Sequence, residues 1–277
     1  MQHNTLTLNR DGHDYHVDFW KPESTKAVLV LIHGHSEYSK RYQHVAEYLN
    51  QENIAVIAPD LFGHGKSAGK RGHVPSYDVY LDSVEEAIAF AKKEFPDLTP
   101  FVYGHSMGGN IVASLAMKRH PDVKGVILSA PWLRLAFEPS KFQLWLANTV
   151  KGILPSLTQP AKLDANGLSR DADVVKAYQD DPMVHGMISP TAFLGLTEHG
   201  EWLIHNNKDW SYPLLHFHGT DDPVTSMPAS KEFFDNIDAE GKDLTFKAWE
   251  GYRHEAHNDV GKEEVLAHIA SWINSRS

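Results

Sequence analysis

The stretch Phe101-Val-Tyr-Gly-His-Ser106-Met-Gly-Gly109-Asn-Ile-Val-Ala-Ser-Leu-Ala-Met-Lys118 decides how this chain folds and where its chemistry lies. It joins an apolar strand pattern, Phe101–Tyr103, to a helical pattern. Between the two, glycines flank Ser106 in the order Gly-x-Ser-x-Gly, which permits a sharp turn and a close approach of the backbone. A serine on such a turn stands clear of the sheet, beside backbone amides that can bind an oxyanion. The pattern predicts that Ser106 is a nucleophile.

The same five-residue pattern occurs a second time, at Gly65-Lys-Ser67-Ala-Gly69. Here it lies in a loop rich in glycine and lysine, and Pro75 follows soon after. No helix pattern begins at Ser67, so the strand–turn–helix context is missing. We interpret this second match as a surface loop.

The rest of the chain alternates between apolar strands and helices. Ala27–Ile32 is a continuous apolar run, as expected for a strand buried on both faces of a parallel sheet. A β-hairpin with Asp11-Gly12 in its turn precedes it. We therefore expect the α/β-hydrolase fold, a mostly parallel eight-stranded sheet flanked by helices, with antiparallel strands at one edge. The other patterns are the strands Asn4–Leu8, Tyr15–Trp20, Ile54–Ala58, Val126–Leu128, Leu214–Phe217 and Leu244–Trp249, and a helix over Tyr77–Ala91.

One long segment interrupts the alternation. Residues 133–205 contain no convincing strand, so we expect a helical cap inserted between strands six and seven, with 1–132 and 206–277 forming the core domain. A long insertion in a compact domain is usually functional. An apolar stripe in the cap could contact lipid or simply pack on the core. The stripe comprises Phe142, Trp145, Leu146, Val150, Ile153, Leu154 and Leu157, preceded by Trp132, Leu133, Leu135 and Phe137.

The composition excludes several classes of function. A net charge of −10 argues against nucleic acid as a partner, because phosphate binding needs clustered Lys and Arg. The chain has no cysteine, which excludes disulfides, thiolate catalysis and Cys-ligated metals. The polar N-terminus has no apolar signal region, and no run of apolar residues is long enough to span a membrane. We expect a cytoplasmic protein, with peripheral attachment to a membrane left open.

A serine nucleophile needs a histidine base that a carboxylate orients, and in this fold the chain order is Ser, acid, His. The loop after Leu214–Phe217 carries two adjacent aspartates, Asp221 and Asp222. We favour Asp222, partly on the family resemblance given below. The loop after the last strand carries His254 and His257, and we favour His254 because it comes first after the glycine turn.

Two backbone amides are expected to form the oxyanion hole. Met107 starts the helix after the nucleophile, so its N–H points at the developing negative charge. The second donor is expected in the loop that His33-Gly34 opens, which makes it the backbone N–H of His35.

The sequence offers no convincing metal or cofactor motif. His254-Glu-Ala-His257 is one residue shorter than the His-Glu-x-x-His zinc motif. His216 and His218 share one face of a strand and could chelate a metal, but a pair without a third ligand is more often packing. Phosphate-binding glycine motifs are absent too, so we infer no metal and no cofactor.

The motifs together resemble the monoacylglycerol lipase and lysophospholipase-like α/β-hydrolases of the serine aminopeptidase S33 group. The resemblance covers nearly the whole chain and places the acid on Asp222 and the base on His254. The chain departs from the family at Ser36, where glycine is common, at Tyr38, where histidine is common, and at His35, which is bulkier than usual. The motifs that carry the resemblance are His33-Gly34-x-x-Glu37-x-Ser39-x-Arg41-Tyr42, Asp60-x-x-Gly63-His64-Gly65-x-Ser67, Gly104–Gly109, Leu168–Asp171 with Asp181-Pro182, His218-Gly-Thr-x-Asp222 and Gly251-Tyr-Arg-His254-Glu255.

The resemblance implies a serine hydrolase that cleaves lipid esters, above all monoacylglycerol to fatty acid and glycerol, with a cap that approaches a membrane or micelle. Lysophospholipase and general short-chain carboxylesterase activity are the enzymatic alternatives. Peptidase activity is less expected, because no acidic cluster is clearly placed to hold a free amino terminus. Outside enzymes, the alternative is a hydrolase-fold protein that binds a ligand without turning it over.

Overall fold

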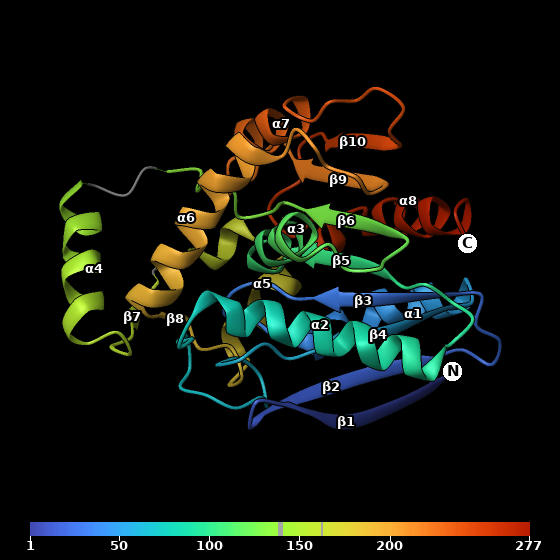
Figure 1. The fold of residues 1–277 in the computed structure, drawn as a ribbon, viewed down its shortest axis with the longest axis horizontal. Coiled ribbons are helices and arrows are strands. Elements are labelled where there is room, and N and C mark those ends of the chain that lie inside the picture. Colours follow the sequence, from blue (N-terminus) through green and yellow to red (C-terminus); the bar gives the residue numbers. More distant parts are fainter. Residues whose placement is uncertain (138–140, 162) are drawn as a thin grey trace.

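The protein is built around one twisted sheet of eight strands (Figure 1). The computed structural model describes residues 1–137, 141–161 and 163–277, without the side chains of 141–144 and 146. The strands lie in the order β1-β2-β4-β3-β5-β6-β9-β10. They comprise β1 (Gln2–Arg10), β2 (His13–Lys21), β3 (Ala27–Ile32), β4 (Ile54–Pro59), β5 (Phe101–His105), β6 (Gly125–Ser129), β9 (Leu214–Gly219) and β10 (Leu244–Trp249).

The pairing of the strands confirms the predicted architecture. Strand β2 is antiparallel to both of its neighbours, β1 and β4, and the other pairs are parallel. The central strands β3 and β4 are buried throughout, as their continuous apolar runs predict. The carboxyl ends of β5, β9 and β10 lie at the same edge of the sheet, which is where an open α/β sheet binds its ligands.

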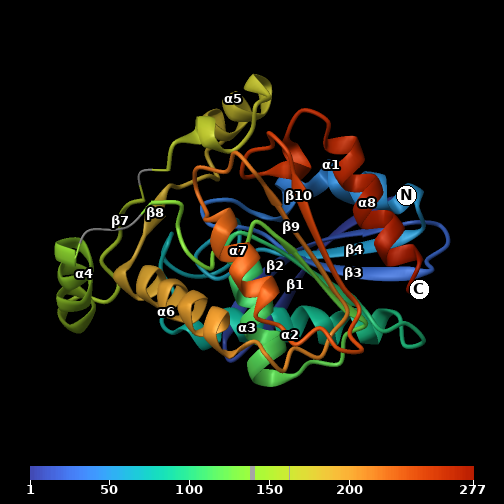
Figure 2. The ribbon, with the colours of Figure 1, turned by 90° about the horizontal axis from the view of Figure 1, so that it is seen from above.

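Helices cover both faces of the sheet (Figure 2). Helices α1 (Gln43–Gln51) and α8 (Lys262–Asn274) pack on one face, through Leu49 and Ile269 among others. Helices α2 (Tyr77–Glu94), α3 (Met107–Arg119) and α7 (Met227–Asp235) contribute to the core on the other face. Each face thus has its own apolar core, as expected for a three-layer domain.

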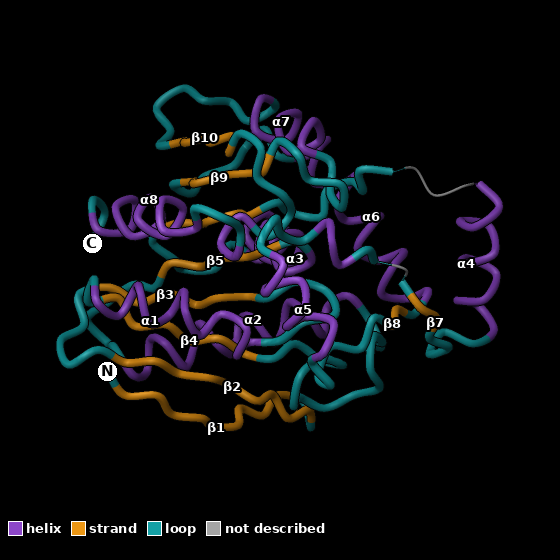
Figure 3. Tube along the Cα trace, turned by 180° about the vertical axis from the view of Figure 1, so that it is seen from behind, coloured by secondary structure: helices purple, strands orange, loops and turns teal. Residues whose placement is uncertain are grey.

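Among the described residues, the segment between β6 and β9 carries three α-helices beyond the strand ends (Figure 3). These are α4 (Lys141–Ile153), α5 (Ala172–Asp180) and α6 (Pro190–Asn206). The last of them, α6, returns to the core and buries Leu196 and Leu203 in the cluster that α3 also joins. The Tyr38 hydroxyl donates a 2.8 Å hydrogen bond to Asp181, which ties this segment to the loop after β3.

Two details of the segment differ from the sequence prediction. Helix α4 ends at Ile153, because Pro155 soon follows and cannot continue a helix. Strands β7 (Gln159–Pro160) and β8 (Met187–Ile188) form a two-residue antiparallel pair where no strand was expected. Strands this short depend on tertiary pairing and leave no periodic pattern. Of the predicted apolar stripe, the side chains of Phe142 and Leu146 lie outside the described residues.

Candidate active site

Ser106 occupies the sharp turn between β5 and α3. Its backbone angles are φ 52° and ψ −115°, a conformation that is unusual for a residue with a side chain. The glycines around it are needed for close approach: a Cβ at Gly108 would lie 2.3 Å from the carbonyl oxygen of Ile32, and one at Gly104 would lie 2.4 Å from that of Gly108. The strained backbone aims the serine side chain into a pocket at the strand ends.

Asp222 follows β9 and carries a fully buried carboxylate. Its Oδ2 atom lies 2.7 Å from Nδ1 of His254. Burial alone would raise the pKa of this carboxyl group, but the charges and hydrogen bonds of His254 and His218 outweigh burial and hold the pKa well below its usual range. Asp221, the other aspartate considered, is exposed at the surface.

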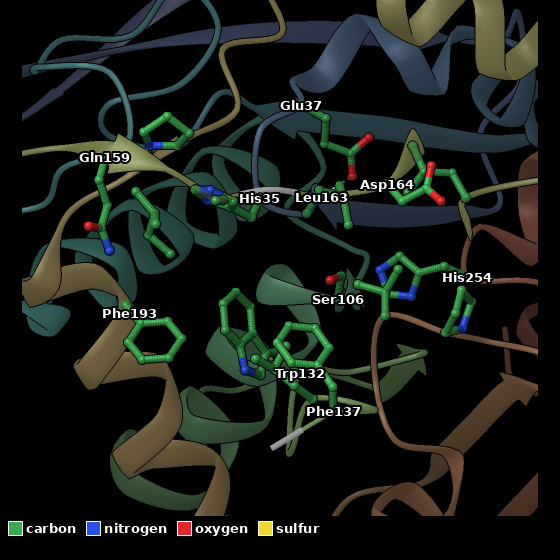
Figure 4. A pocket seen from close by; sticks show the side chains of 18 of the residues that line it. His35, Glu37, Ser106, Trp132, Phe137, Gln159, Leu163, Asp164, Phe193 and His254 are labelled. Carbon is green, nitrogen blue, oxygen red and sulfur yellow. Dashed lines mark hydrogen bonds between the residues drawn. The ribbon is translucent and has the colours of Figure 1, made fainter. Parts of the chain in front are cut away.

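His254 follows β10, is buried, and extends its imidazole toward Ser106 in the close-up of the pocket (Figure 4). Burial lowers the pKa of this histidine, but the neighbouring Asp222 carboxylate raises it above the usual value. His257, the other histidine considered, instead stacks on Tyr42 and lies 3.3 Å from the Tyr103 hydroxyl. Burial lowers the pKa of His257 to about 3, so this ring is neutral.

The two expected oxyanion donors flank the serine. Met107 is the first residue of α3, and His35 lines the same pocket as Ser106. Among the loop and turn hydrogen bonds of the described residues, none uses the backbone N–H of His35. The backbone N–H of Met107, at the start of α3, has no acceptor within the helix. Ser36, the next residue in the loop, has φ 64°, a left-handed conformation that glycine adopts more easily. This conformation gives a physical reason for the glycine that is common there in the family.

The second Gly-x-Ser-x-Gly match has a structural role. The Ser67 hydroxyl is buried, donates to the Asp60 carbonyl oxygen at 2.6 Å and accepts from the His16 N–H at 2.8 Å. It holds the 63–72 loop against β2 and the end of β4, which is a structural role and not that of a nucleophile. Its burial corrects the expectation that the match forms only a surface loop.

The pocket has a polar end and a long apolar part. Its volume is about 670 Å³, within the usual range for small-molecule sites. Ser106, His35, Glu37 and His254 lie at the polar end, and Trp132 stands beside the serine (Figure 4). Apolar side chains, most of them from the segment between β6 and β9, also line the pocket, which suits a hydrocarbon chain. They include Leu135, Phe137, Val150, Leu163, Ile188 and Phe193.

Two buried acids lie beside this polar end. Glu37, His105 and Glu255 place potential metal-ligand atoms within 4.8 Å of one another, the one such group among the described residues. The guanidinium of Arg41 pairs with both carboxylates, however. The pair therefore offers little free negative charge to a metal ion or to the ammonium group of a peptide.

Sequence reasoning missed one residue beside Asp222. The sequence pattern favours a packing role for His218, but its Nε2 atom lies 2.8 Å from Asp222 Oδ2. The only signal was the spacing His218-x-x-x-Asp222, which by itself does not place the two side chains together. His216 packs among phenylalanine rings, as the sequence pattern favours.

The sharp turn at Ser106 between a parallel strand and a helix, with the acid and histidine loops after later strands, defines an α/β-hydrolase. A family model described as "Serine aminopeptidase, S33" matches residues 23–261. The chain belongs to this family.

Several relatives are similar over nearly the full length of this chain. A monoacylglycerol lipase of Mycolicibacterium smegmatis is 32% identical, over 93% of this chain and 92% of that protein. The crystal structure of the Paleococcus ferrophilus monoacylglycerol lipase is 32% identical, with a TM-score of 0.85 and full coverage of both chains. An uncharacterised abhydrolase domain-containing protein of Dictyostelium discoideum is 34% identical, but this chain spans only 28% of its length.

Proposed function

We propose that this protein hydrolyses monoesters of long-chain fatty acids, with monoacylglycerol as the substrate. The observation that carries this proposal is the 2.7 Å hydrogen bond between His254 and Asp222 beside Ser106, at the polar end of a long apolar pocket. The similarity to two monoacylglycerol lipases supports the choice of ester.

In the proposed mechanism, His254 takes the proton of Ser106 as the serine attacks the ester carbonyl carbon. The backbone amides of His35 and Met107 stabilise the oxyanion. Asp222 holds the Nδ1–H of His254, so that Nε2 faces the serine and the imidazolium is stabilised. The protonated His254 gives its proton to the departing glycerol, and a water that His254 then activates releases the fatty acid.

We further propose that residues 133–205 form a cap over this site and that the cap contacts lipid surfaces. Ile153, Leu154 and Leu157 are 73%, 55% and 50% exposed, and all three lie at the carboxyl end of α4 or just after it. Phe137, which lines the pocket, is 59% exposed. Phe137 and Leu157 both line the pocket, and exposed apolar groups next to a pocket are typical of sites that meet a membrane or a partner.

The membrane proposal fits a cytoplasmic protein that binds a bilayer only peripherally. Among the described residues, no helix is both long and apolar enough to cross a membrane. Ile153→Asp is expected to weaken co-sedimentation with phosphatidylcholine vesicles, whereas Val260→Asp, which changes an exposed valine before α8, is the control. Equal sedimentation of both variants and the wild type would contradict the proposed contact.

The decisive experiment compares kcat/KM for monoolein, lysophosphatidylcholine and p-nitrophenyl butyrate, with Ser106→Ala beside the wild type. Monoolein is expected to be preferred by at least about tenfold, roughly 1.4 kcal/mol of transition-state binding. Ser106→Ala is expected to lower kcat by about 10⁵. Preference for lysophosphatidylcholine would make the protein a lysophospholipase, and turnover of the butyrate ester alone would make it a small-ester hydrolase.

A fluorophosphonate probe separates an enzyme from a binding protein of the same fold. The wild type is expected to be labelled at Ser106 and the Ser106→Ala variant to remain unlabelled. A folded wild type that resists labelling would contradict the catalytic assignment.

A further inference from the structure

One oxygen of the Asp222 carboxylate accepts hydrogen bonds from two histidines. His254 Nδ1 lies 2.7 Å from Oδ2, and His218 Nε2 lies 2.8 Å from the same atom. His218 comes from within β9, whereas His254 comes from the loop after β10. All three side chains are almost completely buried.

The chemistry of the partners fixes the proton positions. An ionised carboxylate only accepts hydrogen bonds, so both imidazole nitrogens that face it must carry a proton. The other nitrogen of a neutral His218, Nδ1, then accepts a hydrogen bond from the Ser230 hydroxyl at 2.8 Å. Ser230 lies in α7, so this helix orients the His218 ring.

The second carboxylate oxygen is occupied as well. Asp222 Oδ1 accepts from the backbone N–H groups of Val224 at 2.7 Å and Thr225 at 3.1 Å. The Thr225 hydroxyl has both Asp222 Oδ2 and the Ala130 carbonyl oxygen within reach, but it has only one proton to donate. The carboxylate is thus held from several directions. Among the described residues, the side chains that form hydrogen bonds with it are those of His254, Thr225 and His218.

We propose that His218 is a positioning residue for ester hydrolysis, which aims Asp222 Oδ2 at His254 and shares the charge of that oxygen. The inference rests on the proposed function. A carboxylate that gives part of its charge to His218 attracts a proton on His254 less strongly. His218 thereby keeps His254 rigid and prevents the aspartate from making it too strong a base.

His216 provides a matched comparison within the same strand. It lies two residues before His218, on the same face of β9, and is fully buried. Neither of its ring nitrogens has a hydrogen-bond partner among the described residues, and its ring packs against Phe233 and Phe246. A buried histidine in β9 therefore does not need a triad contact to be accommodated.

The His218 variants leave the other titratable side chains around these rings unchanged. Asp222 forms a hydrogen bond with His218, His254 shares its Oδ2 atom, and His216 lies close enough to interact electrostatically with His218. His105, Glu37 and Glu255 act on His254. Because none of these side chains is changed with His218, a shift of the pH profile reports the lost contact with Asp222.

The experiment measures kcat, KM and the pH dependence of kcat/KM for His218→Leu, His218→Gln and His216→Leu with p-nitrophenyl butyrate. His218→Leu is expected to lower kcat/KM by about 10–100-fold, mainly through kcat, because a hydrogen bond to a charged group is lost. The acid limb of the kcat/KM pH profile of His218→Leu is expected to move to higher pH, because His254 then binds its proton more tightly. Gln places an N–H near the position of His218 Nε2, so His218→Gln is expected to recover most of the activity. His216→Leu is expected to retain the wild-type limb and a kcat/KM within about threefold of the wild type.

A folded His218→Leu protein with the wild-type acid limb would overturn the proposal, as would a His218→Gln protein as slow as His218→Leu. If His218→Leu does not fold, Ser230→Ala removes the hydroxyl that orients the ring, and a smaller shift in the same direction is expected. An unchanged profile for Ser230→Ala would contradict the proposal.

Labelling of Ser106 by the fluorophosphonate keeps this inference separate from the proposed function. A wild type that is not labelled contradicts the proposed function itself. A wild type that is labelled, beside His218 variants labelled at the same rate and with the same pH dependence, contradicts only the role of His218.

Discussion

The backbone N–H of Gly34 donates a 2.6 Å hydrogen bond to the Glu37 carboxylate. The same carboxylate oxygen accepts from the Tyr42 hydroxyl at 2.8 Å, and the other oxygen pairs with Arg41. Because His35 follows Gly34 directly, Glu37 fixes the peptide next to the proposed oxyanion donor. A buried acid outside the proposed triad thus shapes the loop that carries the proposed oxyanion donor.

Glu37→Gln is expected to lower both activity and stability. Gln keeps one acceptor for Gly34 but turns an amide toward the Arg41 guanidinium, so a buried charge loses a partner. We expect a loss of about 2 kcal/mol in the free energy of unfolding and a fall in kcat of about tenfold. Chemical denaturation and steady-state kinetics check both values, with Glu263→Gln on the exposed side of α8 as the control. Wild-type kcat in Glu37→Gln would show that the loop holds its shape without this contact.

The two Gly-x-Ser-x-Gly serines are expected to respond oppositely to substitution. Ser67→Ala removes a buried hydroxyl that holds a loop, so we expect about 1–2 kcal/mol of destabilisation with kcat close to that of the wild type. Thermal unfolding and a turnover assay, run beside Ser106→Ala, distinguish the two sites. A Ser67→Ala protein that folds but has lost turnover would mean that the wrong serine was assigned.

Asp222→Asn is expected to lower kcat by about 10³–10⁴, because an amide favours the wrong tautomer of His254. Asp221→Asn changes the adjacent exposed aspartate and is expected to leave kcat within about twofold of the wild type. Steady-state kinetics on both variants at pH 8 tests this difference. Similar losses in both would argue against Asp222 as the acid.

Stability is expected to fall as the pH drops below about 6.5. Burial lowers the pKa of His35 and of His257 to about 3, so each imidazole binds a proton in the unfolded chain well before it does in the folded protein. Between pH 6.5 and pH 3 the unfolded state therefore holds more protons than the folded state. The free energy of unfolding falls across this range as the pH drops, by at most about 1.4 kcal/mol per pH unit for each histidine.

Urea denaturation between pH 4.5 and 7.5 checks this expectation. A plot of the free energy of unfolding against pH has a slope set by the number of protons taken up on unfolding, and His35→Ala is expected to reduce that number by up to one. His205→Gln changes a histidine that is 62% exposed and serves as the control. A steeper slope in His35→Ala than in the wild type would contradict the sign of the effect.

Much of the fold could be predicted because it depends on local patterns. The continuous apolar runs predict that β3 and β4 are buried strands, and both are buried throughout. The glycines around Ser106 predict a sharp turn before a helix, and Ser106 lies at the turn before α3. The sequence could not distinguish His216 from His218, because both lie on the same face of β9 and their environments come from α7 and distant loops. The preference for Asp222 over Asp221 likewise relied in part on a family resemblance, since two adjacent aspartates fit the same loop.

The pairing of β6 with β9 joins strands that are separated along the chain by the whole of the segment that carries α4, α5 and α6. During synthesis, the strands up to β6 and the turn at Ser106 leave the ribosome first. The proposed acid after β9 and the proposed base after β10 are made close to the end of the chain. On the proposed assignment, a nascent chain carries its nucleophile without any means of activating it, and ester cleavage can begin only when translation is nearly complete.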